Sequence, residues 1–302
     1  MSWRVLGDWG TSRLRLYRIE NGQVTDRCEG PGIGMLTGPA AEVLRAALAP
    51  WCSTTSPTSI DLCGMAGSRS GLNEIPYVDC PAGMREWAAA AASPLVFDGM
   101  RLRIAPGLAC GDAAGRPDVM RGEEAQIFGA VALEPGLGKG SVRFVLPGTH
   151  SKWVEVDNGR VVGFRTCLSG ELFALLCDRS TLISGEVAGD PGDEATGFAE
   201  GLERPAIGAG LLGSLFETRA MQLRVGRSPD WATGFLSGVV IGSEIAEMST
   251  VDGLPDAVVL IGAAALTARY EAALNRFGVG ARQMGGDACV LRGLELIDDY
   301  GR

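Results

Sequence analysis

The alternation of apolar and polar residues at the start of the chain predicts three consecutive strands. The runs WRVLGD (residues 3–8) and RLRLYRI (residues 13–19) have strand character, and the second alternates apolar and basic residues. The ENG tripeptide at 20–22 is a turn of the Asn-Gly kind that favours hairpins. QVTDRCEG at 23–30 continues as the third strand, so the chain opens with a strand followed by a hairpin.

The rest of the first half predicts two helices and a buried strand. GPAAEVLRAALAPW at 38–51 is a helix with Pro39 near its first turn, where proline is tolerated. SIDLCG at 59–64 is a short buried strand that ends in the glycine-rich GMAGSRSG. GEEAQIFGAVALE at 122–134 is a helix whose first turn carries carboxylates, which the helix macrodipole favours.

The second half repeats the order of strands followed by helices. Strands are predicted at 142–148 and 152–166. A series of helices follows, and then a strand–helix–strand–helix unit closes the chain. The predicted helices are 170–178, 193–203, 208–223 and 229–248, and the closing unit comprises 257–262, 263–278, 279–284 and 286–301.

An internal repeat supports this organisation. GTSRLRLYRIENGQV at 10–24 and GTHSKWVEVDNGRVV at 148–162 share a Gly-Thr start, an alternating strand, an acid-Asn-Gly turn and a second strand, with one residue deleted in the second copy. Both features at matched spacing are unlikely to arise by chance. We therefore expect two similar domains, 1–130 and 131–302, each opening with a Gly-Thr hairpin.

Composition narrows the class of protein. The 302 residues are 46% hydrophobic and carry 27 Lys and Arg against 36 Asp and Glu, for a net charge of −9. This acidic balance argues against nucleic acid or an anionic membrane as partner, but leaves room for a small anion held by local donors. The strand pattern begins at once, and no apolar run approaches the roughly 18 residues of a membrane helix.

The cysteines indicate a reducing compartment. Eight cysteines are scattered along the chain without a Cys-x-x-Cys pair. The chain is too long, and its cysteines are too irregularly spaced, to resemble a small disulfide-rich secreted domain. With a single histidine, a zinc site or a Cys-His nucleophile is disfavoured. We expect a cytoplasmic α/β protein, and the sequence leaves its oligomeric state open, a homodimer being one alternative.

The two Gly-Thr hairpins carry the candidate chemistry. A Gly-Thr turn between strands directs backbone N–H groups and a hydroxyl toward one point, which is the geometry of an anion-binding nest. Two such loops facing one cleft could grip a polyphosphate, and a carboxylate two residues before Gly10 suits hydrated Mg²⁺ on the phosphates. The candidate phosphate-binding residues are Gly10, Thr11, Ser12, Gly148, Thr149, Ser151 and Lys152, and the carboxylate is Asp8.

These loops resemble the paired phosphate loops of the actin/sugar-kinase/Hsp70 ATPase superfamily, and VVLIGAAALTARYEAAL at 258–274, with Gly262, is similar to its adenosine segment. More narrowly, the chain resembles the 2-dehydro-3-deoxygalactonokinase family. The stretches that carry this likeness are CGMAGSRSGLNEIPYVDCPAG, PDVMRGEEAQIFGA, LPGTHSKWVEVDNGRV and FLSGVVIGSEI. The resemblance implies an actin-like (ribonuclease H-like) fold with a duplicated mixed sheet, flanking helices and an interdomain cleft.

The same resemblance implies a reaction. ATP with Mg²⁺ would phosphorylate the terminal C6 hydroxyl of 2-dehydro-3-deoxy-D-galactonate, and Asp8 would hold the metal. Such a transfer needs positioning, charge neutralisation and a base near the hydroxyl. GEEA is similar to the catalytic-glutamate element of exopolyphosphatases, which makes Glu123 or Glu124 a candidate base. Asp8 and Asp118 are rivals for that role.

The sugar-acid contacts are expected in the first half. GSRSG places Ser68 and Arg69 on a loop after a strand, and arginine is the usual bidentate partner of a carboxylate. Glu74 and Tyr77 are candidates for the sugar hydroxyls, and the glycine-rich segment 30–36 could close over the substrate.

Two alternatives stay open at this point. One is a polyphosphatase of the same superfamily that uses a glutamate-oriented water, and the other is an actin-like nucleotide-binding regulator without a small substrate. GAGLLG at 208–213 matches G-x-G-x-x-G, but it follows no strand, so it is not read as a dinucleotide site. His150 takes the place of Ser12 in the repeat and is not expected to be a base.

Overall fold

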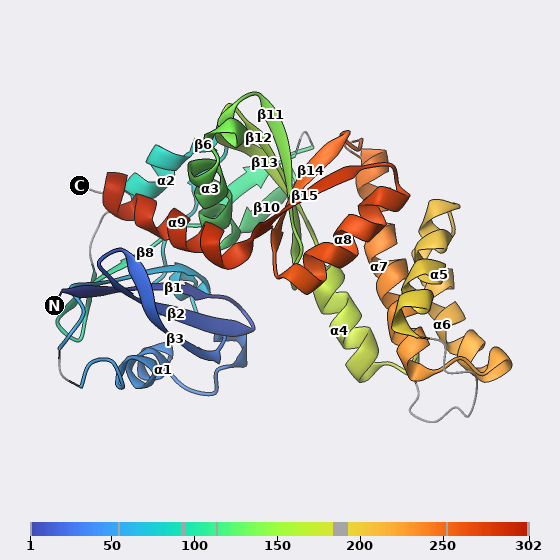
Figure 1. Cartoon of the computed structure of the whole chain (residues 1–302), viewed down its shortest axis with the longest axis horizontal. Coiled ribbons are helices and arrows are strands. Elements are labelled where there is room, and N and C mark those ends of the chain that lie inside the picture. The colour runs from blue at the N-terminus through green and yellow to red at the C-terminus, as the bar shows by residue number, and fades with distance from the viewer. Residues whose placement is uncertain are drawn as a thin grey trace. The chain divides into compact units, whose positions relative to one another are not determined.

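The computed structural model describes residues 2–53, 55–91, 95–112, 114–183, 193–251 and 253–300. It contains mixed sheets flanked by helices, as the sequence predicts (Figure 1). None of the helices in these ranges combines the length and the apolar composition that a bilayer span requires.

The first six-stranded sheet contains the N-terminal hairpin. Strand β1 pairs antiparallel with β2 and parallel with β4, and β4 continues parallel to β8. In order across the sheet, its strands are β3 (Gln23–Pro31), β2 (Arg13–Glu20), β1 (Trp3–Trp9), β4 (Ser59–Gly64), β8 (Met100–Ile104) and β7 (Leu95–Phe97).

The second six-stranded sheet repeats this order. Its strands are β15 (Gly280–Gly285), β14 (Ala257–Gly262), β11 (Ser141–Leu146), β12 (Ser151–Asp157), β13 (Arg160–Cys167) and β6 (Ala82–Gly83). The series β13-β12-β11-β14-β15 corresponds to β3-β2-β1-β4-β8 in chain order within each half, and β11 pairs parallel with β14 just as β1 does with β4. The predicted duplication of the sheet is confirmed.

The two hairpins also share their turn. Asn21 and Gly22 have φ of 50° and 76°, and Asn158 and Gly159 have φ of 48° and 75°. Two consecutive residues with positive φ form the turn whose twist matches that of the flanking strands. The Asn-Gly pair therefore sets the register of both hairpins, as the sequence indicates.

A small third sheet and a short helix lie in a segment where the sequence pattern gave no prediction. The sheet is β10 (Pro117–Met120), β9 (Leu108–Gly111) and β5 (Val78–Asp79), and the helix is α2 (Met84–Ala90). The other helices are α1 (Ala40–Leu48), α3 (Glu123–Leu133), α4 (Ser169–Arg179), α5 (Glu194–Ala206), α6 (Leu211–Val225), α7 (Pro229–Val251), α8 (Ala264–Arg276) and α9 (Gly286–Tyr300). Short helical turns are η1 (Ile33–Met35), η2 (Met65–Gly67) and η3 (Pro135–Gly138).

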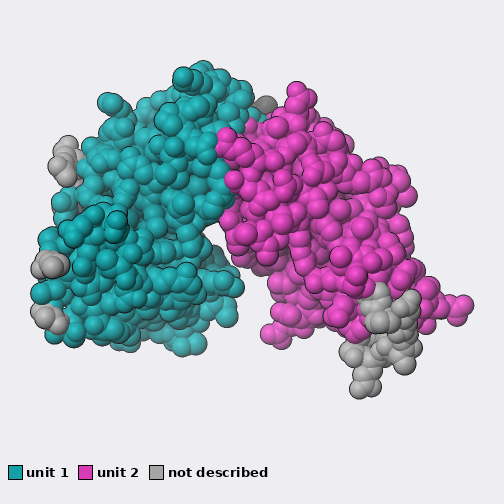
Figure 2. All heavy atoms as spheres, in the orientation of Figure 1, with its two compact units in different colours: residues 1–142, 154–165, 284–302 teal, residues 143–153, 166–283 magenta. Residues whose placement is uncertain are grey.

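The chain forms two compact units, which differ from a division at residue 130 (Figure 2). Unit 1 comprises residues 1–142, 154–165 and 284–302, and unit 2 comprises 143–153 and 166–283. The physical reason lies in two returns of the chain to unit 1. The first two residues of β13, Arg160 and Val161, pair with β6, and helix α9 packs against α3.

The contact of α3 with α9 depends on glycines at both surfaces. A Cβ at Gly129 of α3 would lie 1.8 Å from the carbonyl oxygen of Cys289, and a Cβ at Gly293 of α9 would lie 1.9 Å from that of Ala125. The two backbones therefore approach as closely as only glycine allows. This contact fixes helix α3, whose first turn carries the two candidate glutamates.

In unit 2, helix α5 lies along α7 in the same way (Figure 1). A Cβ at Gly234 of α7 would lie 1.9 Å from the oxygen of Glu194, and one at Gly238 would lie 2.3 Å from that of Phe198. The small residues of FLSGVVIGSEI thus serve close helix packing. Another face of α7 carries Ser237, Ile241 and Glu244, which follow one another by about one helical turn.

We predict that Gly129→Ala lowers the free energy of unfolding by about 1–3 kcal/mol, because the added methyl group overpacks the α3–α9 contact. Urea unfolding measures the effect. The matched control is Gly213→Ala in α6, where a Cβ has no neighbouring atom within 4 Å, so that helix propensity should stabilise by roughly 0.5–1 kcal/mol. Equal urea midpoints for Gly129→Ala and the wild type would contradict the packing argument.

Candidate active site

Asp8 lies at the end of β1, with a paired strand on either side. In the sheet register it stands opposite Arg15 of β2 and Cys63 of β4. Arg15 Nη2 donates to Asp8 Oδ2 at 2.6 Å, and the Cys63 thiol donates to Oδ1 at 3.8 Å. Only 6% of Asp8 is exposed, so this carboxylate is held in place by both neighbouring strands.

The electrostatic environment of Asp8 is mixed. Burial raises the pKa of Asp8, the guanidinium of Arg15 acts in the opposite direction, and the carboxylate of Glu123 raises the pKa further. Arg15 is itself shared, because its Nη1 donates to Asp287 in the first turn of α9 at 3.0 Å. An added cation at Asp8 would therefore relieve both desolvation and repulsion.

Helix α3 begins beside Asp8 because of a glycine at its N-cap. Gly122 has φ of 118°, and its Cβ position lies 3.2 Å from the Cα of Gly64 and 3.9 Å from Asp8 Oδ1. No side chain fits that approach without movement. The sequence MRGEE therefore delivers both glutamates to the end of β1.

The two glutamates have different surroundings. Glu124 is fully buried, and both of its carboxylate oxygens accept from the Gly122 N–H, at 2.9 and 2.8 Å. Burial holds the pKa of Glu124 well above its usual range, and the neighbouring Glu123 adds to the increase. Glu123 is half-buried, and its Oε2 accepts from the Arg121 N–H at 3.1 Å. Asp118, the other rival, lies on β10 opposite Cys110 of β9, in a different sheet from Asp8.

Loop 1 (residues 10–12) directly follows the strand that carries Asp8. The Gly10 N–H donates to the Arg13 carbonyl at 2.8 Å, which closes the turn, and the Thr11 and Ser12 side chains are exposed. The glycine-rich segment 30–36 packs against this loop, with the Gly34 N–H donating to the Thr11 carbonyl at 2.9 Å. In the structure this segment therefore supports loop 1.

Loop 2 (residues 147–150) occupies the equivalent place between β11 and β12. Helix α4 begins against it, because the Glu171 N–H donates to the Thr149 carbonyl at 2.9 Å. Thr149 is exposed, and a Cβ at Gly148 would meet no atom within 4 Å, so this backbone is accessible. His150 Nε2 is 2.6 Å from Glu171 Oε2, which is a bond that shapes the loop.

Two residues expected in the phosphate contacts lie inside unit 2. Ser151 is fully buried, and its hydroxyl donates to Glu244 Oε1 at 2.7 Å. Lys152 is only 3% exposed, and its Nζ donates to the His150 carbonyl at 3.4 Å. The structure thus places Gly148 and Thr149 at the accessible surface of loop 2, while Ser151 and Lys152 belong to the interior beneath it.

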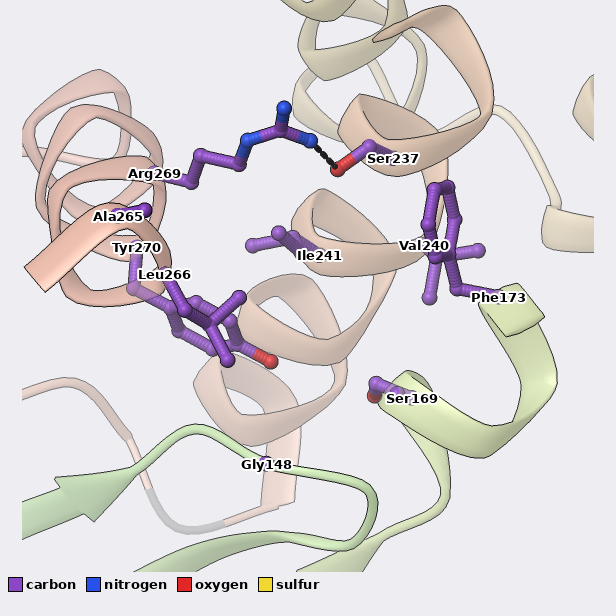
Figure 3. Close-up of a pocket in the computed structure, with 11 residues that line it drawn as sticks. Gly148, Ser169, Phe173, Ser237, Val240, Ile241, Ala265, Leu266, Arg269 and Tyr270 are labelled. Atoms are coloured by element: carbon purple, nitrogen blue, oxygen red, sulfur yellow. Dashed lines mark hydrogen bonds between the residues drawn. The ribbon is translucent and has the colours of Figure 1, made fainter. Parts of the chain in front are cut away.

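A pocket of about 260 Å³ in unit 2 opens beside loop 2 (Figure 3). Its walls come from α4, α7 and α8, with Gly148 at one end. The walls are mainly apolar, and Arg269 Nη1 donates to Ser237 Oγ at 3.2 Å across one side. The lining residues are Gly148, Ser169, Gly170, Phe173, Ser237, Val240, Ile241, Ala265, Leu266, Arg269 and Tyr270.

The pocket includes part of the segment that the sequence identified. Ala265, Leu266, Arg269 and Tyr270 lie within the expected adenosine segment, and Gly262 ends the strand before them, its Cβ position 3.6 Å from the Pro147 carbonyl of loop 2. Their i, i+1, i+4, i+5 spacing marks one face of α8 and could have indicated them. Sequence reasoning missed the contribution of α4, for which the sequence gives no separate signal. Ser237 lies in FLSGVVIGSEI, one of the stretches that carry the family resemblance.

The residues expected to hold the sugar acid lie in unit 1, after β4. Arg69 Nε donates to Glu74 Oε1 at 2.9 Å, and the two side chains are 89% and 59% exposed. The Ser68 hydroxyl donates to the Met65 carbonyl at 2.8 Å. Tyr77 lies under the guanidinium of Arg121, 4.2 Å from the ring centroid, so it is linked through Arg121 to the start of α3.

Comparison with known proteins decides the family. The model of the 2-keto-3-deoxy-galactonokinase family matches residues 8–297. The chain belongs to this family. A protein of Rhizobium meliloti named a probable 2-dehydro-3-deoxygalactonokinase is 40% identical over 95% of this chain and 94% of its own. The 2-dehydro-3-deoxygalactonokinase of Escherichia coli K12 is 34% identical over 96% and 95%.

Solved structures agree with the fold. The crystal structure of a Sinorhizobium meliloti protein assigned as a 2-dehydro-3-deoxygalactonokinase matches with a TM-score of 0.86 and 34% identity, over 98% of this chain and 95% of that one. Component A of (R)-2-hydroxyglutaryl-CoA dehydratase from Acidaminococcus fermentans matches with a TM-score of 0.51 and 11% identity over the whole of both chains, which shows the fold alone. The expected actin-like fold class is confirmed.

Membership of the 2-keto-3-deoxy-galactonokinase family makes the chain a kinase-family enzyme, and the reaction of the family is the ATP-dependent phosphorylation of a sugar acid. The expectation that the chain is an ATP-dependent sugar-acid kinase is thereby confirmed. The roles of the individual site residues stay predictions.

We predict that Glu124→Gln gains stability relative to the wild type as the pH rises from 5 to 8. The raised pKa means that folded Glu124 binds its proton more tightly than unfolded Glu124 does. Between the unfolded and the folded pKa, wild-type stability therefore falls with rising pH, by up to about 1.4 kcal/mol per pH unit. Glutamine does not titrate, so the variant lacks this pH-dependent loss of stability.

Urea unfolding at several pH values measures this difference. Glu42→Gln is the control, since Glu42 also lies in the first turn of a helix, α1, but is exposed. A stability difference between Glu124→Gln and the wild type that stays flat over this pH range would show that burial does not govern the proton on Glu124.

Proposed function

We propose that this protein transfers the γ-phosphoryl group of ATP to the terminal C6 hydroxyl of 2-dehydro-3-deoxy-D-galactonate. The observation that carries the proposal is the arrangement at the end of β1. There a buried carboxylate, Asp8, lies two residues before loop 1, and the N-terminus of α3 approaches it with two glutamates. Phosphoryl transfer needs these elements, because its catalysis is mainly positioning and charge stabilisation.

The pocket of unit 2 fits the nucleoside of ATP. Its apolar walls and few polar groups are typical of small-molecule sites. Gly148 lines its end and the neighbouring Thr149 is exposed, so these two residues of loop 2 would bind the phosphates. Gly10, Thr11 and Ser12 of loop 1 stay predicted phosphate contacts.

Asp8 fits a role as a ligand of Mg²⁺. Within the ranges that the structure describes, no group of three or more His, Cys, Asp or Glu side chains forms a metal cage. Mg²⁺ in phosphoryl-transfer sites is instead held by one or two carboxylates, the substrate phosphates and water. The metal would neutralise charge on the phosphates. Asp8 would orient it, directly or through water, and Arg15 would keep the carboxylate in place.

Glu123 is the base that the geometry favours. Both oxygens of Glu124 are directed back to the Gly122 N–H, so this side chain holds the turn that starts α3. Glu123 is half-buried and lies near enough to Asp8 to affect its pKa. We assign to Glu123 the acceptance of the proton from the C6 hydroxyl, and to Glu124 the positioning of the helix start.

Arg69 is the proposed partner of the substrate carboxylate. Its present pairing with Glu74 shows that it can reach a carboxylate from this exposed position. A substrate carboxylate would take the place of Glu74 or share the guanidinium with it, since arginine offers five donors. Ser68, Glu74 and Tyr77 would then lie around the sugar hydroxyls.

We place the reaction in the cytoplasm. All eight cysteines are free thiols, which supports a reducing compartment. A homodimer stays a prediction.

ATP consumption with a panel of acceptors tests the function. The panel contains 2-keto-3-deoxy sugar acids, including both C4 epimers, and plain hexoses. We predict that 2-dehydro-3-deoxy-D-galactonate gives the highest kcat/KM, with one ADP formed per phosphate ester. Asp8→Asn, purified in the same way, controls for contaminating kinases and should lose about 10²–10³-fold in kcat. Phosphate release without any acid would favour the polyphosphatase, and ATP binding without turnover would favour the regulator.

We predict that Arg69→Ala raises the KM of the sugar acid about 10-fold or more, while the KM of ATP stays within twofold. The reason is the loss of one charge-assisted contact, worth roughly 1.5–3 kcal/mol. Arg116→Ala is the matched control, because Arg116 is also exposed and paired with a carboxylate, that of Asp112. A rise in the KM of ATP with no change for the acid would remove Arg69 from the carboxylate role.

A further inference from the structure

A buried carboxylate beneath loop 2 has no part in the chemistry proposed above. Glu244 lies within α7 and is only 4% exposed. Its Oε1 accepts from the Ser151 hydroxyl and from Trp153 Nε1, both at 2.7 Å, and its Oε2 accepts from the Tyr270 hydroxyl at 2.7 Å. The Ser169 side chain is a fourth hydrogen-bond partner. Four donors thus converge on one side chain.

These donors come from the separate elements that surround the unit 2 pocket. Ser151 is the first residue of β12, directly after loop 2. Ser169 begins α4 and Tyr270 belongs to α8, and both line the pocket, where Figure 3 shows them on opposite sides. Glu244 itself follows the pocket residue Ile241 by one turn of α7. One carboxylate therefore joins loop 2 to three helices.

The four hydrogen-bond partners of Glu244 are neutral hydroxyl and indole donors, so dipoles stabilise its charge. Burial raises the pKa of Glu244, and the four hydrogen bonds act in the opposite direction. Burying a carboxylate is costly, and apolar residues of similar volume often fill such a place at least as well. Packing alone therefore does not account for an ionisable group at this point.

A carboxylate differs from an apolar side chain because it orients the hydrogen-bond donors around it. It is an acceptor on both oxygens, so each of the four groups must point its hydrogen toward it. This fixes the rotamers of Ser151 and Tyr270 and, through them, the end of loop 2 and the face of α8. Substrate-positioning elements are effective only when such supporting contacts hold them within a fraction of an ångström.

We propose that Glu244 is a positioning residue for the nucleotide, which holds loop 2 and the walls of the unit 2 pocket in the arrangement that binds ATP. This rests on the proposed function in one respect, namely that the pocket takes the nucleotide. The residues proposed for the sugar acid lie in unit 1, whereas Glu244 and its four partners all belong to unit 2. Loss of Glu244 should therefore affect the two substrates unequally.

The test is Glu244→Gln, an isosteric change that directs an NH₂ group at groups that are themselves donors. We predict that the Kd of ATP, measured by calorimetry, and the KM of ATP both rise about 10-fold. The KM of the sugar acid should stay within twofold. The matched control is Glu247→Gln, one turn further along α7 and exposed, which should leave both values unchanged.

A double-mutant cycle with Ser151→Ala separates an action through Glu244 from a direct contact of Ser151 with phosphate. If Ser151 acts through Glu244, the ATP affinity of the double variant should be close to that of Glu244→Gln alone. Additive losses would mean that the two residues act independently. Ser151→Ala removes only a hydroxyl, so it also keeps the test available if Glu244→Gln fails to fold. Wild-type ATP affinity in Ser151→Ala would then overturn the proposal.

Each failure has a distinct signature. A wild-type protein that does not bind ATP in calorimetry would contradict the proposed function. A wild-type protein that binds ATP, with a Glu244→Gln variant of equal affinity but lower melting temperature, would show that Glu244 serves stability alone. Parallel rises in KM for ATP and for the sugar acid would likewise overturn the positioning role.

Discussion

The burial of Asp8 at the end of a central strand is the constraint on which the site depends. A carboxylate with strands on both sides needs a compensating charge, and the antiparallel register supplies it by placing Arg15 directly opposite. The carboxylate also needs space on its remaining side, which the glycines at 64 and 122 provide. The same space admits the start of α3, and the α3–α9 glycine contact then fixes that helix. The position of Asp8 therefore depends both on its ion pair with Arg15 and on the close packing around it.

The duplicated sheet has been adapted differently in its two copies. Two residues before the Gly-Thr pair, the first copy has Asp8 and the second has Leu146, which is buried and apolar. Loop 2 therefore has no carboxylate at the matching place. The carboxylate near loop 2 is instead that of Glu244, which lies on a helix beneath the loop. Its oxygens accept hydrogen bonds from within unit 2. In the proposed function, the first copy would hold the metal and the reacting group, and the second would hold the nucleotide.

The sequence predicted the repeated hairpins and most helices, because Asn-Gly turns and apolar periodicity are local signals. It did not predict the β5–β9–β10 sheet, whose strands have two to four residues, too few to show a period. The compact units differ from the expected division at residue 130 because α9 returns to α3, a contact between residues far apart in the chain. In the candidate site, the sequence motifs predict Asp8 and the two loops, and their roles stay predictions. The inward direction of Ser151 and the contribution of α4 depend on tertiary packing, which no local pattern reveals.

The adjacent glutamates at the start of α3 are a further case in which the sequence alone does not separate two residues but the structure does. Consecutive residues on a helix point about 100° apart, so a Glu-Glu pair cannot serve one environment. The sequence leaves the two equivalent. The structure separates them, since Glu124 turns into the core and accepts from Gly122, whereas Glu123 stays half-buried beside Asp8. Burial raises the pKa of Glu124, and both of its oxygens are directed to the Gly122 N–H. The structure thus gives a physical reason for the proposal that Glu124 holds the helix start and Glu123 acts as the base.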